Sequence, residues 1–226
     1  EIGVRLVGSE MCIRDRLKHV ESCKHQLRCG YIVHNGKHMK EYEMKRTFDE
    51  DLERAISFHG HLCGGQLTGV RMARYALSYF GIEDPDTYRD LIVFVECDRC
   101  LTDAIMTVTN CHPGKRRMKC LDFGKQAATF YDIQSGKAIR MTNISEKAPK
   151  NCDLRAWFAE RSDSDLFKIE KVNVHITEND LPGRPRQVAQ CCKCGETVTD
   201  GREVLGADGQ VLCRNCANGS CYDVVE

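Results

Sequence analysis

Four cysteines near the C-terminus have the residue type and the spacing that hold a zinc ion. Cys191 and Cys194 form one Cys-x2-Cys pair, and Cys213 and Cys216 form the other. Two thiolates on one tight turn can occupy adjacent corners of a tetrahedron, about 2.3 Å from the ion. Four protein thiolates close the coordination sphere, so the sequence predicts a structural zinc site. Cys192 is an alternative ligand to Cys191 because the two are neighbours.

A second set of candidate functional residues lies in the main part of the chain, spread over three segments. In chain order they are His59, His61, Cys63, Cys100, Asp103 and Cys111. Thiolates bind soft or borderline metals and attack electrophiles, and an imidazole can complete a metal site or act as a general base. A carboxylate can orient that imidazole or transfer a proton. The structural alternative is that the cysteines are simply buried and the histidines cap backbone groups.

Cys63 and Cys100 each stand just before a predicted helix. The N-terminus of a helix carries partial positive charge, which lowers the pKa of a nearby thiol. We therefore expect both residues to be thiolates near neutral pH. If the three segments meet in one pocket, they form a metal-dependent or thiol-dependent centre.

Residues 58–141 resemble the FmdE family, which takes its name from the E component of formylmethanofuran dehydrogenase. The family pattern contains Phe-His-Gly-His-x-Cys-Pro-Gly, Glu-x-Asp-x-Cys-x-x-Asp-Ala, Thr-Gly-Cys and Asp-x-Gly-Lys. The corresponding segments begin here at Phe58, Glu96, Thr109 and Asp122. The C-terminal cysteines are similar to the DksA/TraR-type four-cysteine zinc finger that is attached to many family members.

The resemblance implies an α+β protein, with a mixed sheet packed with helices and a small C-terminal zinc ribbon or treble clef, that forms a homodimer. It implies catalytic roles for His61, Cys63, Cys100 and Asp103. Cofactor contacts are assigned to His59, Cys111 and Lys115, and a second metal ion to His61, Cys63 and Cys100. The chain departs from the pattern at Gly64, Met106, Asn110 and His112. Met106 in place of glutamine removes a polar contact, which favours a different substrate.

The elements that must position these residues follow from hydrophobic periodicity. Helices are predicted at 48–58, 67–80, 102–109 and 154–161, and strands at 91–95, 118–123, 127–133, 138–141 and 171–176. Residues 134–136 are predicted to form a hairpin turn, and residues 204–212 a hairpin within the zinc module. The run 181–186, with two prolines and a glycine, predicts a linker.

We predict four parts along the chain: an N-terminal extension (1–46), an FmdE-like domain (47–180), a linker (181–189) and a zinc-finger domain (190–226). Residues 1–16 have no periodicity and resemble a translated sequencing adapter, so the extension is interpreted as non-native or disordered. Translation could begin at Met39 or Met44. The alternative is a metal site in the extension at Cys23, His25, Cys29 and His34.

Composition restricts the class of protein. Lys+Arg and Asp+Glu are balanced at 33 each, which argues against general binding to nucleic acid or to an anionic membrane. We find no apolar run of the roughly 20 residues that span a bilayer, and no export signal. We therefore expect a cytoplasmic location. Because the cytoplasm is reducing, the 15 cysteines are better explained by metal binding or thiolate chemistry than by structural disulfides.

Three functions remain open on the sequence. The first is an enzyme or enzyme accessory of one-carbon (formylmethanofuran-type) or related anaerobic redox metabolism, acting on an unknown small-molecule substrate. The second is delivery of a metal or cofactor to a partner oxidoreductase, which the Cys-x2-Cys pair at Cys97 and Cys100 favours. The third is a regulatory or binding protein acting through the zinc finger, which has no basic patch. A redox pair of Cys97 with Cys100 is a further option.

Overall fold

The computed structural model describes residues 33–34, 37–38, 44–207 and 209–225. Of the candidate ligands in the N-terminal extension, Cys23, His25 and Cys29 lie outside these residues. His34 belongs to a short antiparallel pair of strands, β1 (Val33–His34) and β2 (Lys37–His38), in which the side chains are not described.

A five-stranded mixed sheet has the order β4-β3-β5-β6-β7. Strand β3 (Leu91–Val95) pairs in parallel with β4 (Met118–Cys120) and antiparallel with β5 (Ala127–Asp132). Strands β6 (Lys137–Asn143) and β7 (Phe167–Lys171) continue the sheet antiparallel. Four of the five residues of β3 are buried, as its unbroken apolar run predicts.

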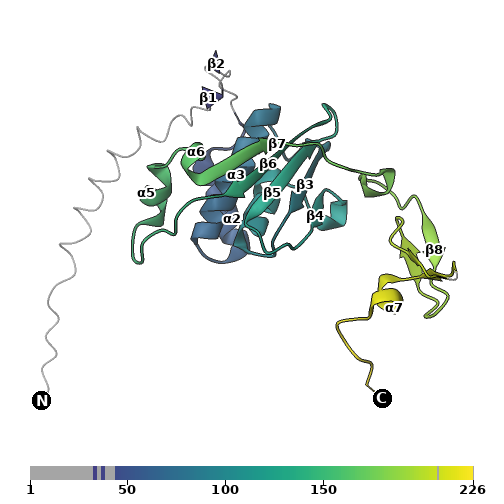
Figure 1. Cartoon of the computed structure of the whole chain (residues 1–226). Helices are drawn as coiled ribbons and strands as arrows, with labels where there is room; N and C mark the ends of the chain where they lie inside the picture. Colours follow the sequence, from purple (N-terminus) through teal and green to yellow (C-terminus); the bar gives the residue numbers. More distant parts are fainter. Residues whose placement is uncertain (1–32, 35–36, 39–43, 208, 226) are drawn as a thin grey trace, which may run out of the picture.

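Three helices pack against one another and, together with the sheet, enclose the hydrophobic core. They are α2 (Phe48–His59), α3 (Gly64–Phe80) and α4 (Cys100–Thr109). In the view of Figure 1, α2 and α3 lie behind the sheet. The mixed α+β architecture predicted from the sequence is thus confirmed. In the part of the chain that the structure describes, no helix is both long and apolar enough to cross a membrane.

The bounds predicted for strands β7 and β4 are wrong, for different physical reasons. The last strand of the sheet was expected at 171–176 but is Phe167–Lys171. The capped helix α6 (Asp163–Leu166) ends immediately before this strand. Because Leu166 and Phe167 are buried, the residues that follow them pair with the sheet. Strand β4 ends at Cys120 rather than residue 123, because left-handed backbone at Asp122 (φ 46°) and Gly124 (φ 66°) turns the chain.

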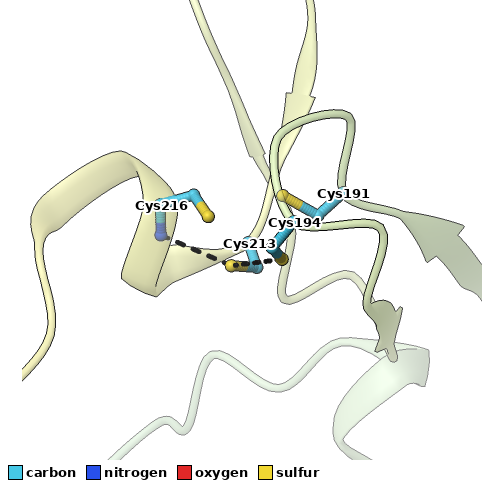
Figure 2. Close-up of side chains that lie close together, drawn as sticks. All are labelled: Cys191, Cys194, Cys213 and Cys216. Carbon is cyan, nitrogen blue, oxygen red and sulfur yellow. Dashed lines mark hydrogen bonds between the residues drawn. The ribbon is translucent and has the colours of Figure 1, made fainter. Parts of the chain in front are cut away.

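The remaining elements are short. Helix α5 (Leu154–Ala159) precedes α6, and the 3-10 turns are η2 (Pro113–Lys115) and η3 (Glu178–Asp180). The chain then forms two hairpins, β8 (Val188–Gln190) with β9 (Thr197–Thr199) and β10 (Val204–Leu205) with β11 (Val211–Leu212), and ends in α7 (Arg214–Asn218). We call residues 188–218 the C-terminal module; Figure 2 shows its four clustered cysteines. Its first strand begins inside the predicted linker.

The segment that leads into this module is held by one arginine. Arg116, which follows η2, donates from Nε to the carbonyl oxygen of Leu181 at 3.3 Å. Its terminal nitrogens contact the carbonyl of Asn179 and the carboxylate of Asp200. The predicted linker is therefore attached at its start to the parallel edge of the sheet.

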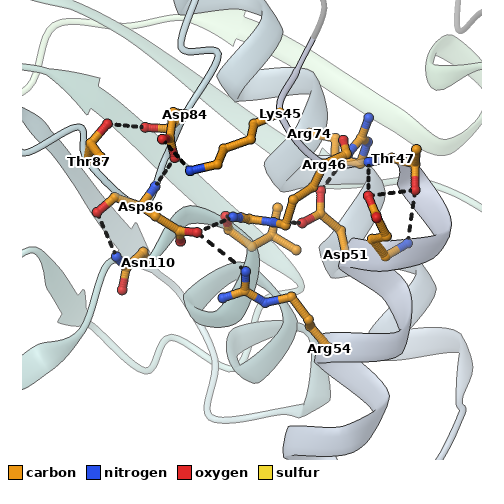
Figure 3. Close-up of polar contacts among 12 residues, drawn as sticks. Lys45, Arg46, Thr47, Asp51, Arg54, Arg74, Asp84, Asp86, Thr87 and Asn110 are labelled. Atoms are coloured by element: carbon orange, nitrogen blue, oxygen red, sulfur yellow. Dashed lines mark hydrogen bonds and ion pairs between the residues drawn. The ribbon is translucent and has the colours of Figure 1, made fainter.

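A buried ion-pair network fastens the chain just before α2 to the rest of the fold (Figure 3). Asp51 is 2% exposed and accepts hydrogen bonds from Arg46 Nε at 2.6 Å and from Arg74 Nη1 at 2.5 Å. Arg46 also contacts the carboxylate of Asp86 at 2.5 Å and the carbonyl of Val108 at 2.9 Å. Asp51 thus bridges Arg46 and Arg74, and the network ties α2, α3 and the end of α4 together.

Substitution of Asp51 by alanine is expected to lower the free energy of unfolding by about 3–5 kcal/mol, because two partly buried guanidinium groups would lose their common counter-ion. Urea denaturation followed by circular dichroism measures this change. The control is Lys45→Ala, which breaks a pair in which the lysine side chain is 58% exposed and should cost about 1 kcal/mol or less. Equal losses in the two variants would contradict the prediction.

Candidate metal centres

The sulfur atoms of Cys191, Cys194, Cys213 and Cys216 lie within 4.8 Å of one another (Figure 2). The Sγ atoms of Cys194 and Cys213 are 3.8 Å apart. A tetrahedron with metal–sulfur bonds of about 2.3 Å has edges of about 3.8 Å. The four thiols are therefore spaced to hold one tetrahedral ion, and zinc fits this donor set.

Each pair of cysteines sits on a backbone turn that directs two sulfurs to the same point. In the β8–β9 hairpin, Gly195 adopts a left-handed conformation (φ 73°) and donates its N–H to the carbonyl of Cys191 at 2.9 Å. At the start of α7, Cys213 is the N-cap, and its sulfur accepts the N–H of Cys216 at 3.4 Å. The turn at Gly195 and the N-terminus of α7 thus place the two cysteine pairs opposite each other.

Of the two neighbouring cysteines 191 and 192, the structure places the first in the cluster. Cys191 is 2% exposed, whereas Cys192 lies at the surface and donates its S–H to Gln210 Oε1 at 3.1 Å. Hydrogen bonds from the backbone of Cys194 and Cys213 lower the pKa of Cys191 to about 6. The thiol of Cys213 raises the pKa of Cys216 to about 12, so an incoming ion must displace a proton there.

A second group that could hold a metal lies between α2 and α3. The ligand atoms of His59, His61 and Cys63 are within 4.8 Å of one another. His59 is the last residue of α2, and Gly60 in left-handed conformation (φ 94°) reverses the chain. Cys63 is the N-cap of α3. One tight turn between two helices therefore supplies all three side chains.

The imidazole of His59 is oriented as in a metal ligand. Its Nδ1 lies 2.8 Å from Oδ2 of Asp103, the carboxylate predicted to orient a histidine. Its Nε2 is buried and has no hydrogen-bond partner among the described residues. A metal-bound histidine commonly donates its other ring N–H to a carboxylate, which directs the free lone pair at the ion. The residues present thus fit a metal ion.

Close packing of α3 against α4 brings Cys100 to the same place. A Cβ atom on Gly65 would lie only 2.8 Å from Cys100 Cβ, so a glycine is needed for this approach. Gln66, a buried side chain outside the predicted site residues, donates from Nε2 to the carbonyl of Cys100 at 2.7 Å. In the sequence, the one feature that could have identified Gln66 is that it is a polar residue on an otherwise apolar face of the predicted helix. Cys100 therefore lies beside the turn that carries Cys63, close enough for the two thiols to influence each other.

The expectation of a lowered thiol pKa is wrong for Cys100. Burial, followed by the hydrogen bond and the charge of Cys63, raises its pKa above the ordinary value. The positive end of α4 does not compensate for the loss of water and for a second thiol in contact. In the absence of a metal, Cys100 is therefore a thiol rather than a thiolate near neutral pH.

The third predicted segment does not join the centre. Cys111 is fully buried beyond the C-terminal end of α4, and its S–H donates to the carbonyl of Leu91 at 3.4 Å. Lys115 lies at that same end, with Nζ 3.3 Å from Asn110 Oδ1. Because a ten-residue helix is about 15 Å long, neither residue reaches Cys100 at the other end. Cys111 and Lys115 therefore lie apart from the group of His59, His61 and Cys63, and their roles as cofactor contacts stay predictions.

Comparison with known proteins adds three findings. The model of the family described as "FmdE, Molybdenum formylmethanofuran dehydrogenase operon" matches residues 58–178. A curated relative from Archaeoglobus fulgidus, named "Probable S-adenosyl-L-methionine-binding protein", is 30% identical over 206 residues, which cover 77% of this chain and 54% of the relative. The chain therefore spans about half the length of that relative.

The third finding is a similar solved structure. It is the crystal structure of a tungsten formylmethanofuran dehydrogenase FmdE-like protein from Syntrophus aciditrophicus, at 22% identity and a TM-score of 0.48. The alignment covers 79% of this chain and 96% of that one.

Proposed function

This chain belongs to the FmdE family, and we propose that it binds a reactive metal ion at His59, His61 and Cys63 in addition to a structural zinc ion in its C-terminal module. The observation that carries the proposal is the state of His59, with Nδ1 held by Asp103 and a buried Nε2 that lacks a partner among the described residues. Such an orphaned imidazole nitrogen is costly unless a ligand satisfies it.

The two proposed centres differ in what they leave open. Four cysteines saturate a tetrahedral ion in the C-terminal module, which suits a structural role. The group of His59, His61 and Cys63 supplies three ligands, and a tetrahedral ion held by three protein ligands keeps a position for water or substrate. A metal bound there supplies Lewis acidity. Cys100 and Asp103 border the same turn and can hold or transfer protons beside a bound molecule.

We assign the protein to one-carbon metabolism of the formylmethanofuran type, or to a related anaerobic redox pathway, as an enzyme or an enzyme accessory acting on a small molecule. The family name supports this assignment. Delivery of metal to a partner oxidoreductase by a Cys97–Cys100 pair is less well supported, because Cys97 is 1% exposed and belongs to the hydrophobic core. We keep a homodimer and a division into an FmdE-like domain and a zinc-finger domain as parts of the proposal.

Metal analysis of anaerobically purified protein tests the proposal. We expect two ions per chain in the wild type and one in Cys63→Ser. Cys191→Ser should retain the ion in the main domain. One ion per chain in the wild type, with no loss on substitution of Cys63, would overturn the second centre.

Binding of S-adenosyl-L-methionine is a second candidate function, favoured by the name of the relative from Archaeoglobus fulgidus. Isothermal titration calorimetry with this compound tests it. Heat of binding that disappears in Cys63→Ser would assign the compound to the metal centre, and an absence of binding to the metal-loaded protein would exclude this candidate.

A further inference from the structure

Two thiols from distant parts of the sequence lie close to each other in the main domain, because residues 65 and 66 pack against Cys100. Cys63 caps α3 and Cys100 begins α4, and the thiol of one interacts with that of the other. Both residues are half-buried, so small oxidants can reach them. This proximity depends on Gly65, whose missing side chain admits Cys100, and on the hydrogen bond from Gln66 to the Cys100 carbonyl.

This pair differs from the pair that the sequence suggests. The Cys-x2-Cys spacing would join Cys97 with Cys100, but Cys97 packs in the hydrophobic core. Cys111 is likewise buried, at the far end of α4. Of these four cysteines of the main domain, Cys63 and Cys100 are the two that are both accessible and adjacent.

We propose that Cys63 and Cys100 form a reversible disulfide, and that its formation releases the metal ion bound at His59, His61 and Cys63. The inference rests on the proposed function, because Cys63 is both a metal ligand and one of the two thiols. A sulfur in a disulfide no longer carries the thiolate charge that binds an ion. Two imidazoles alone would hold the metal much more weakly.

The oxidant is a peroxide, and the step balances without another reactant. The sulfur of Cys63 attacks the O–O bond of hydrogen peroxide, which gives a sulfenic acid and one water molecule once the leaving oxygen is protonated. The Cys100 sulfur then attacks the sulfenic sulfur, the S–S bond forms, and the second oxygen leaves as water. Two electrons pass from the thiols to the peroxide, and the ion leaves with its charge unchanged. A small dithiol reverses the modification by thiol–disulfide exchange.

The experiment uses the full-length, metal-loaded protein and one equivalent of hydrogen peroxide under anaerobic conditions. We expect peptide mapping after alkylation to show a cross-link between Cys63 and Cys100, with a mass loss of about 2 Da. After desalting, the wild type should retain one ion fewer per chain, and dithiothreitol followed by metal should restore it. Cys100→Ser should retain both ions for longer, whereas the control Cys97→Ser should behave as wild type.

A geometric control separates proximity from chemistry. Gly65→Ala places a Cβ atom against Cys100 and should reduce cross-linking at least tenfold, whereas Gly64→Ala, which meets no atom within 4 Å, should not. A cross-link that forms without loss of metal would contradict the proposal that the disulfide releases the ion. Loss of metal without the cross-link would do the same. If the wild type holds no main-domain ion yet still forms the disulfide, the proposed function fails and the thiol pair stands.

Discussion

Replacement of Cys213 by serine is expected to unfold the C-terminal module and to release its metal ion. Within the described part of residues 188–218, only Cys191 and Asp200 are buried, so the module has no hydrophobic core of its own. Binding of zinc to small four-ligand modules contributes about 10–16 kcal/mol, which here must replace the missing core. Loss of one of four thiolates removes most of that stabilisation.

Amide NMR spectra and zinc content together measure this effect. In Cys213→Ser the resonances of the module should collapse to random-coil positions, while those of the five-stranded sheet stay in place. The matched control is Cys192→Ser, which removes a surface thiol adjacent to the cluster and should leave metal and spectrum unchanged. A folded, metal-free module in Cys213→Ser would show that contacts other than metal binding stabilise it.

Substitution of Asp103 by asparagine is expected to weaken metal binding in the main domain about 10- to 100-fold, the usual effect of removing a carboxylate behind a ligating histidine. The carboxylate lies 2.8 Å from His59 Nδ1 and selects the tautomer in which Nε2 is free to bind. An amide can present its N–H instead, which would permit the wrong tautomer. Competition with a chromophoric chelator, using Co²⁺, gives the affinity.

The matched control for this experiment is Asp98→Asn, in the same segment of the chain. Asp98 has a side chain that is 71% exposed and only a loose contact of 3.8 Å with Arg99. Its substitution removes the same charge at the surface and should leave the affinity unchanged. Equal affinities in wild type and Asp103→Asn would mean that His59 is not a ligand, whereas equal losses in both variants would indicate a general charge effect.

Features that depend on neighbouring residues could be predicted from the sequence alone. The buried strand Leu91–Val95 and the helices before and after the histidine-containing turn follow from hydrophobic periodicity. The C-terminal ligand set follows from spacing, because each Cys-x2-Cys pair forms its own turn. The family motifs also identified the turn at residues 59–63 as the place for chemistry.

The tertiary structure alone decided which thiols meet. Cys63 and Cys100 lie close together because glycines at 65 and 69 let the backbone of α4 approach α3. A Cβ atom at Gly69 would lie 2.5 Å from the carbonyl of Leu101. Cys111 is placed at the opposite end of α4 by the length of that helix. Spacing along the chain carries no information about the packing of two helices, and for that reason it suggested Cys97 as the partner that the structure buries in the core.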